Sequence, residues 1–181
     1  MSQPLNITTK EQAIWQILEQ ITDPEIPVIS IVDLGIVRAV KVSPVGGDPL
    51  AIGSKGAEIL ITPTYSGCPA MDVIAMNIRM ELLQKGFSDI KITQQLSPAW
   101  TTNWMTEKGK QQLKAYGIAP PQSLSGNARI SKMLFNDEEK VECPQCHSKN
   151  SKLLSQFGST ACKALYQCID CKEPFDYFKC H

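Results

Sequence analysis

Cysteines are the residues best suited to carry chemistry in this chain of 181 residues. Six of the seven lie in the last 39 residues, and four of these form the pattern C-x2-C-x21-C-x2-C: Cys143, Cys146, Cys168 and Cys171. Two residues between cysteines let each pair chelate one ion, and two such pairs supply a tetrahedron of sulfur atoms. The spacing therefore predicts one four-thiolate metal site. Structural zinc is favoured, although iron also binds such a site.

Two cysteines of the tail, Cys162 and Cys180, lie outside this pattern. In a regular strand Cys162 points to the same side as Cys168, because strand side chains alternate. Cys180 is followed by the terminal His181. Both thiols are candidates for additional metal ligands, for a transient acceptor of a second metal or cluster, or for small buried apolar residues.

The seventh cysteine, Cys68, stands in a turn rich in hydroxyl groups, one of them from Thr64. Pro69 suits the first position of a helix, so Cys68 lies at or beside the N-cap. Free backbone N–H groups and the helix dipole favour negative charge there. We therefore expect a lowered thiol pKa and a thiolate that can bind metal or react at neutral pH. The alternative is a buried structural cysteine.

Two acidic residues and two tryptophans elsewhere in the sequence are further candidates for functional residues. Asp23 and Glu25 are candidates for ligands or for hydrogen-bond partners of the Cys68 turn. They could equally cap a helix or hold a rigid turn. Trp100 and Trp104 are candidates for lining a pocket or a partner surface, and equally for core packing.

These side chains need a scaffold, and the hydrophobic pattern predicts its elements. Helices are expected at 10–22, 69–85 and 104–116, and strands at 36–42, 57–63 and 90–96. Apolar positions at a helical spacing support the second helix: Val73, Met76, Met80 and Leu83, with Ile74, Ile78 and Leu82 beside them. The order predicts an α/β (α+β) domain with a small three-stranded mixed sheet, because a helix between the last two strands allows them to be parallel.

The tail adds a second pattern, with a hairpin expected from 151–156 and 160–167 and a third strand at 174–179. About 40 residues bury too little core to fold alone, so a metal must supply the missing folding energy. The sequence therefore predicts three segments. Residues 1–117 form the α/β domain, 118–141 a linker, and 142–181 a zinc-ribbon domain.

The balance of charges argues against some classes of binding partner for this chain. Lys and Arg total 18, as do Asp and Glu, so the net charge is zero. Binding of nucleic acid or of an anionic membrane through bulk charge is not expected. The N-terminus lacks the pattern of a secretory signal, and no apolar run approaches the roughly 20 residues that span a bilayer. We expect a cytoplasmic protein, in which clustered cysteines bind metal rather than form disulfides.

Three short motifs in this order, Asp23-Pro-Glu-Ile-Pro27, Ile31-Val-Asp-Leu-Gly35 and Thr62 through Pro69, resemble the SufT-like metal–sulfur cluster biosynthesis domain. That domain occurs in iron–sulfur assembly factors. The resemblance implies that Cys68 is the functional cysteine, and that Asp23 and Glu25 form the acidic turn of the family. It also implies a transient iron or iron–sulfur cluster as a ligand of the thiol.

Nearly the whole chain resembles the PaaD family of the phenylacetate degradation system. The resemblance rests on Ser97-Pro-Ala-Trp-Thr-Thr102, Gly117-Ile-Ala-Pro-Pro121, Phe157 through Leu165 and Pro174 through Cys180. It implies an accessory component of the multicomponent phenylacetyl-CoA epoxidase, in which other subunits carry the diiron oxygenase and the flavin/iron–sulfur reductase. The implied partners are those subunits, especially the iron–sulfur reductase.

Three functions follow from the sequence and these resemblances. The first is maturation of an iron–sulfur or diiron centre by a protein that is not itself catalytic. One exposed thiolate does not hold a stable cluster, which suits a transfer factor or a homodimer that shares ligands. The second is a structural or regulatory subunit bound stably to the epoxidase, and the third is rubredoxin-like electron transfer by the tail.

Overall fold

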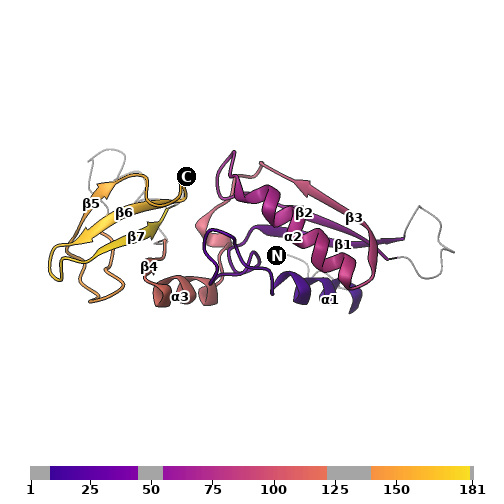
Figure 1. Ribbon diagram of the computed structural model, residues 1–181, viewed down its shortest axis with the longest axis horizontal. Coiled ribbons are helices and arrows are strands. Elements are labelled where there is room, and N and C mark those ends of the chain that lie inside the picture. The colour runs from indigo at the N-terminus through magenta and orange to yellow at the C-terminus, as the bar shows by residue number, and fades with distance from the viewer. Residues whose placement is uncertain (1–8, 45–54, 122–139, 180–181) are drawn as a thin grey trace, which may run out of the picture. The chain divides into compact units, whose positions relative to one another are not determined.

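The computed structural model describes residues 9–44, 55–121 and 140–179 (Figure 1). They belong to two units, Met1–Trp100 and Thr101–His181. The first unit holds the mixed sheet and two helices, and the second holds the cysteine-rich tail. The predicted boundary at residue 117 thus lies 17 residues beyond the division between the units, because a third helix belongs with the tail. Within the described ranges, no helix has the length and apolar character to cross a bilayer.

The first helix, α1 (Thr9–Leu18), buries Ile14 and Leu18 completely. It ends four residues earlier than predicted. After Leu18 the backbone changes to i→i−3 bonds, with the N–H of Ile21 donating to the carbonyl of Leu18. The chain then folds back, since the N–H of Asp23 donates to Ile29 and that of Ile31 to Ile21. These long-range bonds end the helix before the prolines do.

The sheet of the first unit has the predicted mixed topology, which is confirmed. Strand β1 (Val37–Pro44) pairs antiparallel with β2 (Lys55–Ile61), and β2 pairs parallel with β3 (Phe87–Gln94). Helix α2 (Ala70–Gln84) connects β2 to β3. Residues 45–54, between β1 and β2, lie outside the described residues.

One face of this sheet is apolar and the other is charged. Val40, Ile59 and Ile92 occupy facing positions in the register of the three strands, and Ile59 is fully buried. The next row, Lys41, Glu58 and Lys91, lies on the opposite face, where Lys91 Nζ is 3.0 Å from Glu58 Oε1. The hydrogen bond from Lys91 lowers the pKa of Glu58. Helices α1 and α2 contact β1 and β3 respectively and also each other, so both helices cover the apolar face.

Helix α2 carries apolar residues on two sides. One side faces the sheet and is buried: Met71, Ile74, Ile78 and Leu82. The other side is exposed and consists of Val73, Met76, Met80 and Leu83. The stripe that helped to predict this helix is therefore not part of the core.

The second unit begins with the short 3-10 helix η2 (Thr102–Trp104) and helix α3 (Glu107–Tyr116). Thr106 caps α3, because its hydroxyl accepts a hydrogen bond from the N–H of Gly109. Gly117 ends the helix in the left-handed conformation that glycine tolerates best. The predicted helix at 104–116 is thus divided by a short extended link.

Four strands form the sheet of the second unit, in the order β4-β7-β6-β5. The predicted hairpin and third strand are confirmed as β5 (Ser151–Ser155), β6 (Lys163–Cys168) and β7 (Pro174–Phe178). The fourth strand, β4 (Ile118–Ala119), was not predicted and pairs parallel with β7. It falls in the segment predicted as a linker, of which residues 122–139 lie outside the described ranges.

Candidate metal centre and thiol site

The four cysteines of the C-x2-C pairs meet in space. Their sulfur atoms all lie within 4.8 Å of one another, with Cys143 Sγ 3.8 Å from Cys171 Sγ and Cys146 Sγ 3.5 Å from Cys168 Sγ. A tetrahedral zinc ion with Zn–S bonds near 2.3 Å requires sulfur atoms about 3.8 Å apart. The arrangement therefore fits one tetrahedral ion. Within the described residues, no other group of three or more candidate ligands converges in this way.

Backbone turns hold each pair of cysteines in position. The N–H of Cys143 donates to the carbonyl of Ser148 at 2.8 Å, and that of Cys168 donates to Glu173 at 3.0 Å. The residue after the second cysteine of each pair, His147 in one and Lys172 in the other, has a positive φ of 62° and 67°. The two turns are thus built alike, and each returns the chain directly after its second ligand.

Hydrogen bonds from backbone N–H groups support the sulfur atoms. Those of Cys171 and Asp170 lower the pKa of Cys168 to about 7. Cys171 accepts a bond from the N–H of Glu173, but burial and the neighbouring cysteine sulfurs outweigh it and raise its pKa to about 12. Four thiolates this close repel one another, so they ionise together only with a cation between them.

One carboxylate joins the two turns. Asp170, between Cys168 and Cys171, accepts hydrogen bonds from the Ser148 hydroxyl and, at 2.9 Å, from Asn150 Nδ2. Both donors follow the first cysteine pair. Such bonds fix the orientation of ligands around a metal. Sequence reasoning missed Asp170, and its only signal was its place inside the second C-x2-C pair.

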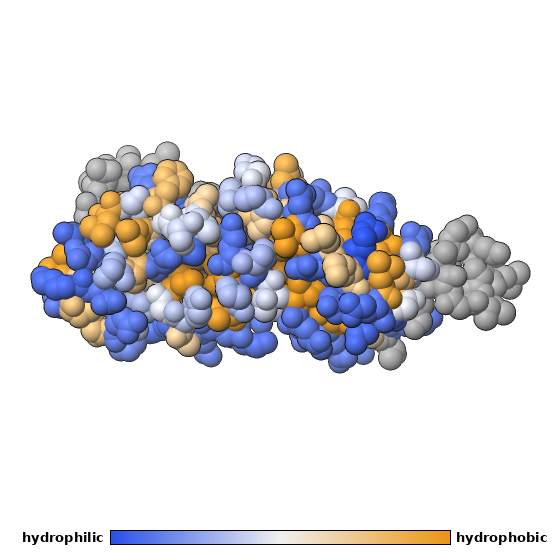
Figure 2. Space-filling view, viewed as in Figure 1, coloured by the Kyte–Doolittle hydropathy of each residue, from blue (hydrophilic) through white to orange (hydrophobic). Residues whose placement is uncertain are grey.

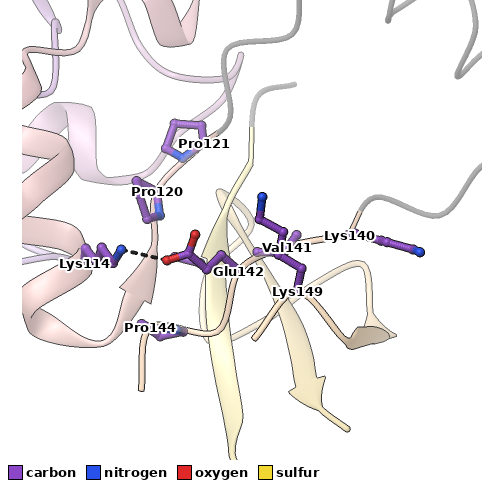
Figure 3. Close-up of a pocket in the computed structure, with 9 residues that line it drawn as sticks. Lys114, Pro120, Pro121, Lys140, Val141, Glu142, Pro144 and Lys149 are labelled. Carbon is purple, nitrogen blue, oxygen red and sulfur yellow. Dashed lines mark hydrogen bonds and ion pairs between the residues drawn. The ribbon is translucent and has the colours of Figure 1, made fainter. Parts of the chain in front are cut away.

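A cleft of about 270 Å³ lies beside the first cysteine pair (Figure 3). Pro120, Pro121 and Lys149 contribute to its walls. Across it, Lys114 Nζ on α3 lies 2.8 Å from Glu142 Oε1, and this hydrogen bond lowers the pKa of Glu142. Because Glu142 directly precedes the ligand Cys143, this pair ties helix α3 to the metal centre.

Of the two extra cysteines, only Cys162 lies in the described residues, and it does not join the four ligands. Cys162 is buried, and its sulfur lies 3.0 Å from the Thr160 hydroxyl. It precedes the start of β6, whereas Cys168 stands at the end, so about 20 Å of strand separates them. Cys180 lies outside the described residues.

Cys68 is half-buried in the turn before α2, and the prediction of a lowered thiol pKa is wrong. Burial raises the pKa of Cys68. The N–H of Ala70, at the start of α2, and the Tyr65 side chain hydrogen-bond the thiol and lower its pKa, but by less. The helix terminus therefore acts on the thiol as expected, while loss of water dominates.

The acidic turn acts on the same thiol. The charges of Glu25 and Asp23 raise the pKa of Cys68 further, so both carboxylates act electrostatically on the thiol. Asp23 is buried, and its Oδ1 accepts hydrogen bonds from the N–H groups of Glu25 and Ile26 at 2.8 and 2.9 Å. Asp23 thus holds a rigid turn, which is one of the roles considered for it. Thr64 is also buried.

A hydrogen bond joins Trp100 to the segment that follows the acidic turn. Trp100 is buried, and its Nε1 donates to the carbonyl of Leu34 at 3.1 Å. In the same segment, Ser30 Oγ donates to Asp33 Oδ2 and accepts from the N–H of Asp33, both at 2.9 Å. Trp100 therefore packs in the core of the first unit rather than lining a pocket, while Trp104 is partly exposed.

Two family models match this chain, one over the segment that contains Cys68 and the other over the segment that contains the four clustered cysteines. Residues 11–86 match the model of a family described as "Iron-sulfur cluster assembly protein", and residues 127–179 match the "PaaD zinc beta ribbon domain". The first match contains Asp23, Glu25 and Cys68. The second contains all four converging cysteines, so the ribbon and its closed thiolate set agree with a structural zinc site.

Relatives cover most of the chain. A protein of Escherichia coli (strain K12), provisionally named as the D subunit of 1,2-phenylacetyl-CoA epoxidase, is 47% identical over 92% of this chain and 91% of its own length. An "Fe-S protein maturation auxiliary factor" of Porphyromonas gingivalis (strain ATCC BAA-308 / W83) is 33% identical over 57% of this chain and 90% of its own. A crystal structure of a domain of unknown function from Bacillus anthracis is 26% identical, covers 57% of this chain and 90% of that one, and has a TM-score of 0.49.

Proposed function

The chain belongs to the family of 1,2-phenylacetyl-CoA epoxidase D subunits, and from this premise we propose that it is an accessory component that helps to mature the iron–sulfur or diiron centre of an epoxidase system. The observation that carries the proposal is that Cys68 lies within the electrostatic influence of two carboxylates, Glu25 and Asp23, in the segment that matches iron–sulfur cluster assembly proteins. Iron or a cluster is then the cargo of the protein, whereas zinc belongs to its own structure.

The electrostatics of the thiol site support a cationic cargo. The negative charges of Glu25 and Asp23 oppose ionisation of Cys68 and attract a cation to the same place. The thiol therefore stays protonated until an iron-bearing species displaces the proton. A site that activated the thiol as a general nucleophile would show the reverse, a lowered pKa.

The number of ligands supports transfer rather than storage. Asp23 Oδ1 already accepts two backbone hydrogen bonds, and the ligand atoms of Asp23, Glu25 and Cys68 do not converge as those of the tail do. Cys68 thus offers one strong ligand, and the remaining ligands come from the client. An ion held by few protein ligands leaves readily.

The zinc ribbon then serves in client recognition. Its four thiolates are used in folding, and the cleft beside its first cysteine pair, lined by Lys114, Lys140, Lys149 and Glu142, offers a docking surface. The clients we propose are the other epoxidase subunits, the iron–sulfur reductase above all.

Analysis of the reductase from a phenylacetate-grown deletion strain tests this function. We expect its iron and acid-labile sulfide to fall in the strain without this protein and in a strain with Cys68→Ser. Ser66→Ala, in the same turn and exposed, is the matched control and should restore both. Full iron–sulfur content and activity in the deletion strain would refute the maturation role.

The name of the E. coli relative favours a second candidate, a structural or regulatory subunit bound stably to the epoxidase. This candidate predicts a stoichiometric complex in pull-downs and full epoxidase activity with Cys68→Ser. The same set of strains therefore distinguishes the two functions.

A further inference from the structure

The exposed side of α2 carries a row of four large apolar residues, and we propose that it is the contact surface between two copies of this chain, packed with their α2 helices antiparallel. Val73, Met76, Met80 and Leu83 are 39%, 55%, 51% and 50% exposed. The spacing of three, four and three residues keeps them on one side of the helix. We call these four residues the outer stripe.

The outer stripe differs from scattered apolar residues on a surface. Its members adjoin one another over three helical turns, whereas single exposed apolar residues are ordinary. Figure 2 shows apolar residues at the surface over α2, among polar ones. Two of the four are methionines, which adapt their shape to a partner. The sheet-facing residues of α2 already supply the fold with its core, so folding does not account for the stripe.

Two opposite charges flank the stripe on the same side. Asp72 and Arg79 are seven residues apart, or about two turns, and both line a groove of about 360 Å³ between α2 and β3. Ile61, Met71 and Ile92 form apolar parts of the same groove. The flank is therefore acidic near the start of α2 and basic farther along it.

This order of charges matches a second copy of itself. We consider a two-fold axis that is perpendicular to both antiparallel helices. It places the charged flanks of the two copies on the same side of the interface, running in opposite directions. Asp72 then meets Arg79 of the partner subunit, and Arg79 meets Asp72 of the partner subunit, as an interface with two-fold symmetry requires. A surface built for a uniformly acidic or basic partner would carry one sign of charge instead.

The same register joins the two stripes. The axis that pairs positions 72 and 79 passes between residues 75 and 76. Met76 then lies beside Met76 of the partner subunit, and Val73 falls between Met76 and Met80 of the partner subunit at a rise of 1.5 Å per residue. Met80 therefore lies next to Val73 of the partner subunit, and Leu83 lies beyond the end of the opposite stripe. One register thus pairs the charged flank and brings Val73, Met76 and Met80 of the two stripes together. This inference does not depend on the maturation role.

Sedimentation of the full chain between about 1 and 200 µM tests the interface. We expect a reversible dimer, which Met76→Glu and Met80→Glu each convert to a monomer. Both positions are exposed in the single chain, so circular dichroism should stay unchanged. Leu96→Glu replaces a similarly exposed apolar residue outside α2 and should leave the dimer intact. A wild-type chain that stays monomeric throughout overturns the proposal, even if a client protein covers the stripe.

Charge exchange tests the antiparallel register. Asp72→Arg and Arg79→Asp each place like charges opposite one another twice per dimer, so each should weaken self-association roughly tenfold. Arg79 also donates to the carbonyl of Ile90, so its substitution alone is ambiguous. An equimolar mixture of the two variants removes the ambiguity, because the heterodimer restores both opposite-charge contacts. Preferential heterodimer formation supports the register, and its absence overturns it.

Discussion

Cys146 and Cys168 are 22 residues apart in the chain, yet their sulfur atoms lie 3.5 Å from each other. The distance fits two ligands of one zinc ion and joins the two cysteine-bearing turns of the ribbon. Holding these four thiols together without a cation is unfavourable, since their protons or charges compete for the same space. The zinc content of the protein and the effect of removing the ion can both be measured.

The purified protein should hold one zinc ion per chain, which chelation at equilibrium or Cys168→Ser removes. Because structural zinc contributes on the order of 10 kcal/mol to small domains, the near-ultraviolet signal of Tyr166 and Tyr177 should be lost with it. Elemental analysis and circular dichroism give the two readouts. Cys162→Ser is the control and should keep its zinc, because Cys162 lies just before the start of β6 and the ligand Cys168 lies at its end. Zinc retained by Cys168→Ser would contradict the assignment.

Alkylation of Cys68 should be slower than that of an unburied cysteine at neutral pH and should rise with pH past the ordinary thiol pKa. A raised pKa leaves less thiolate at a given pH, and the thiolate is the reactive form. Glu25→Gln removes a charge that raises the pKa, so it should speed the reaction at pH 8 roughly two- to threefold. Mass spectrometry of the Cys68 peptide measures the rate. Glu81→Gln, near the other end of α2, should have no effect, and a fast reaction of the wild type at pH 7 would contradict the raised pKa.

Asp23→Ala should destabilise the first unit by about 1–3 kcal/mol, because it leaves two backbone N–H groups without their acceptor. Asp23→Asn keeps an acceptor oxygen and should cost less. Urea unfolding followed by tryptophan fluorescence measures both, since Trp15 and Trp100 lie in this unit. Equal losses for the two variants would show that charge, and not the hydrogen bonds, sets the role of Asp23.

Gly158→Ala should destabilise the ribbon by about 1–3 kcal/mol through steric crowding. A Cβ atom at this position would lie 2.7 Å from Asp176 Oδ1 and 3.4 Å from Lys163 Cβ. Asp176 cannot simply turn away, because it also lies 3.5 Å from the buried Lys163 ammonium. Thermal unfolding of the zinc-bound protein gives the readout. Ser159→Ala removes only an exposed hydrogen bond to Asp176 and should change the midpoint little.

The spacing of residues in the sequence predicted those structural features that are determined by residues close together in the chain. The four ligands follow from two C-x2-C pairs, and the mixed sheet follows from a helix between two strands. Strand β4 escaped prediction because two residues carry no periodic pattern, and its pairing with β7 depends on the distant Asp176 and Tyr177. The end of α1 escaped it because bonds between residues 21–23 and 29–31 decide it.

The candidate thiol site shows the same division. The contact between Cys68 and the start of α2 could be expected from Pro69, and it is present. The sign of the pKa shift could not be expected from the sequence, because burial of the turn and the influence of the Glu25 charge depend on the tertiary fold. Asp170 was hidden for a similar reason, since its donors Ser148 and Asn150 precede it by 22 and 20 residues.

Because strand β4 is part of its sheet, the ribbon cannot be transferred to another protein as residues 127–179 alone. The family match begins at residue 127, whereas the sheet takes its fourth strand from Ile118–Ala119, and Lys114 of α3 binds Glu142 beside the metal ligands. A graft that begins at the family boundary would leave β7 as an open edge, a surface on which strands of other molecules add and aggregate. Transplanting the ribbon into another protein therefore calls for a cut before α3, and natural recombination of this domain carries the same constraint.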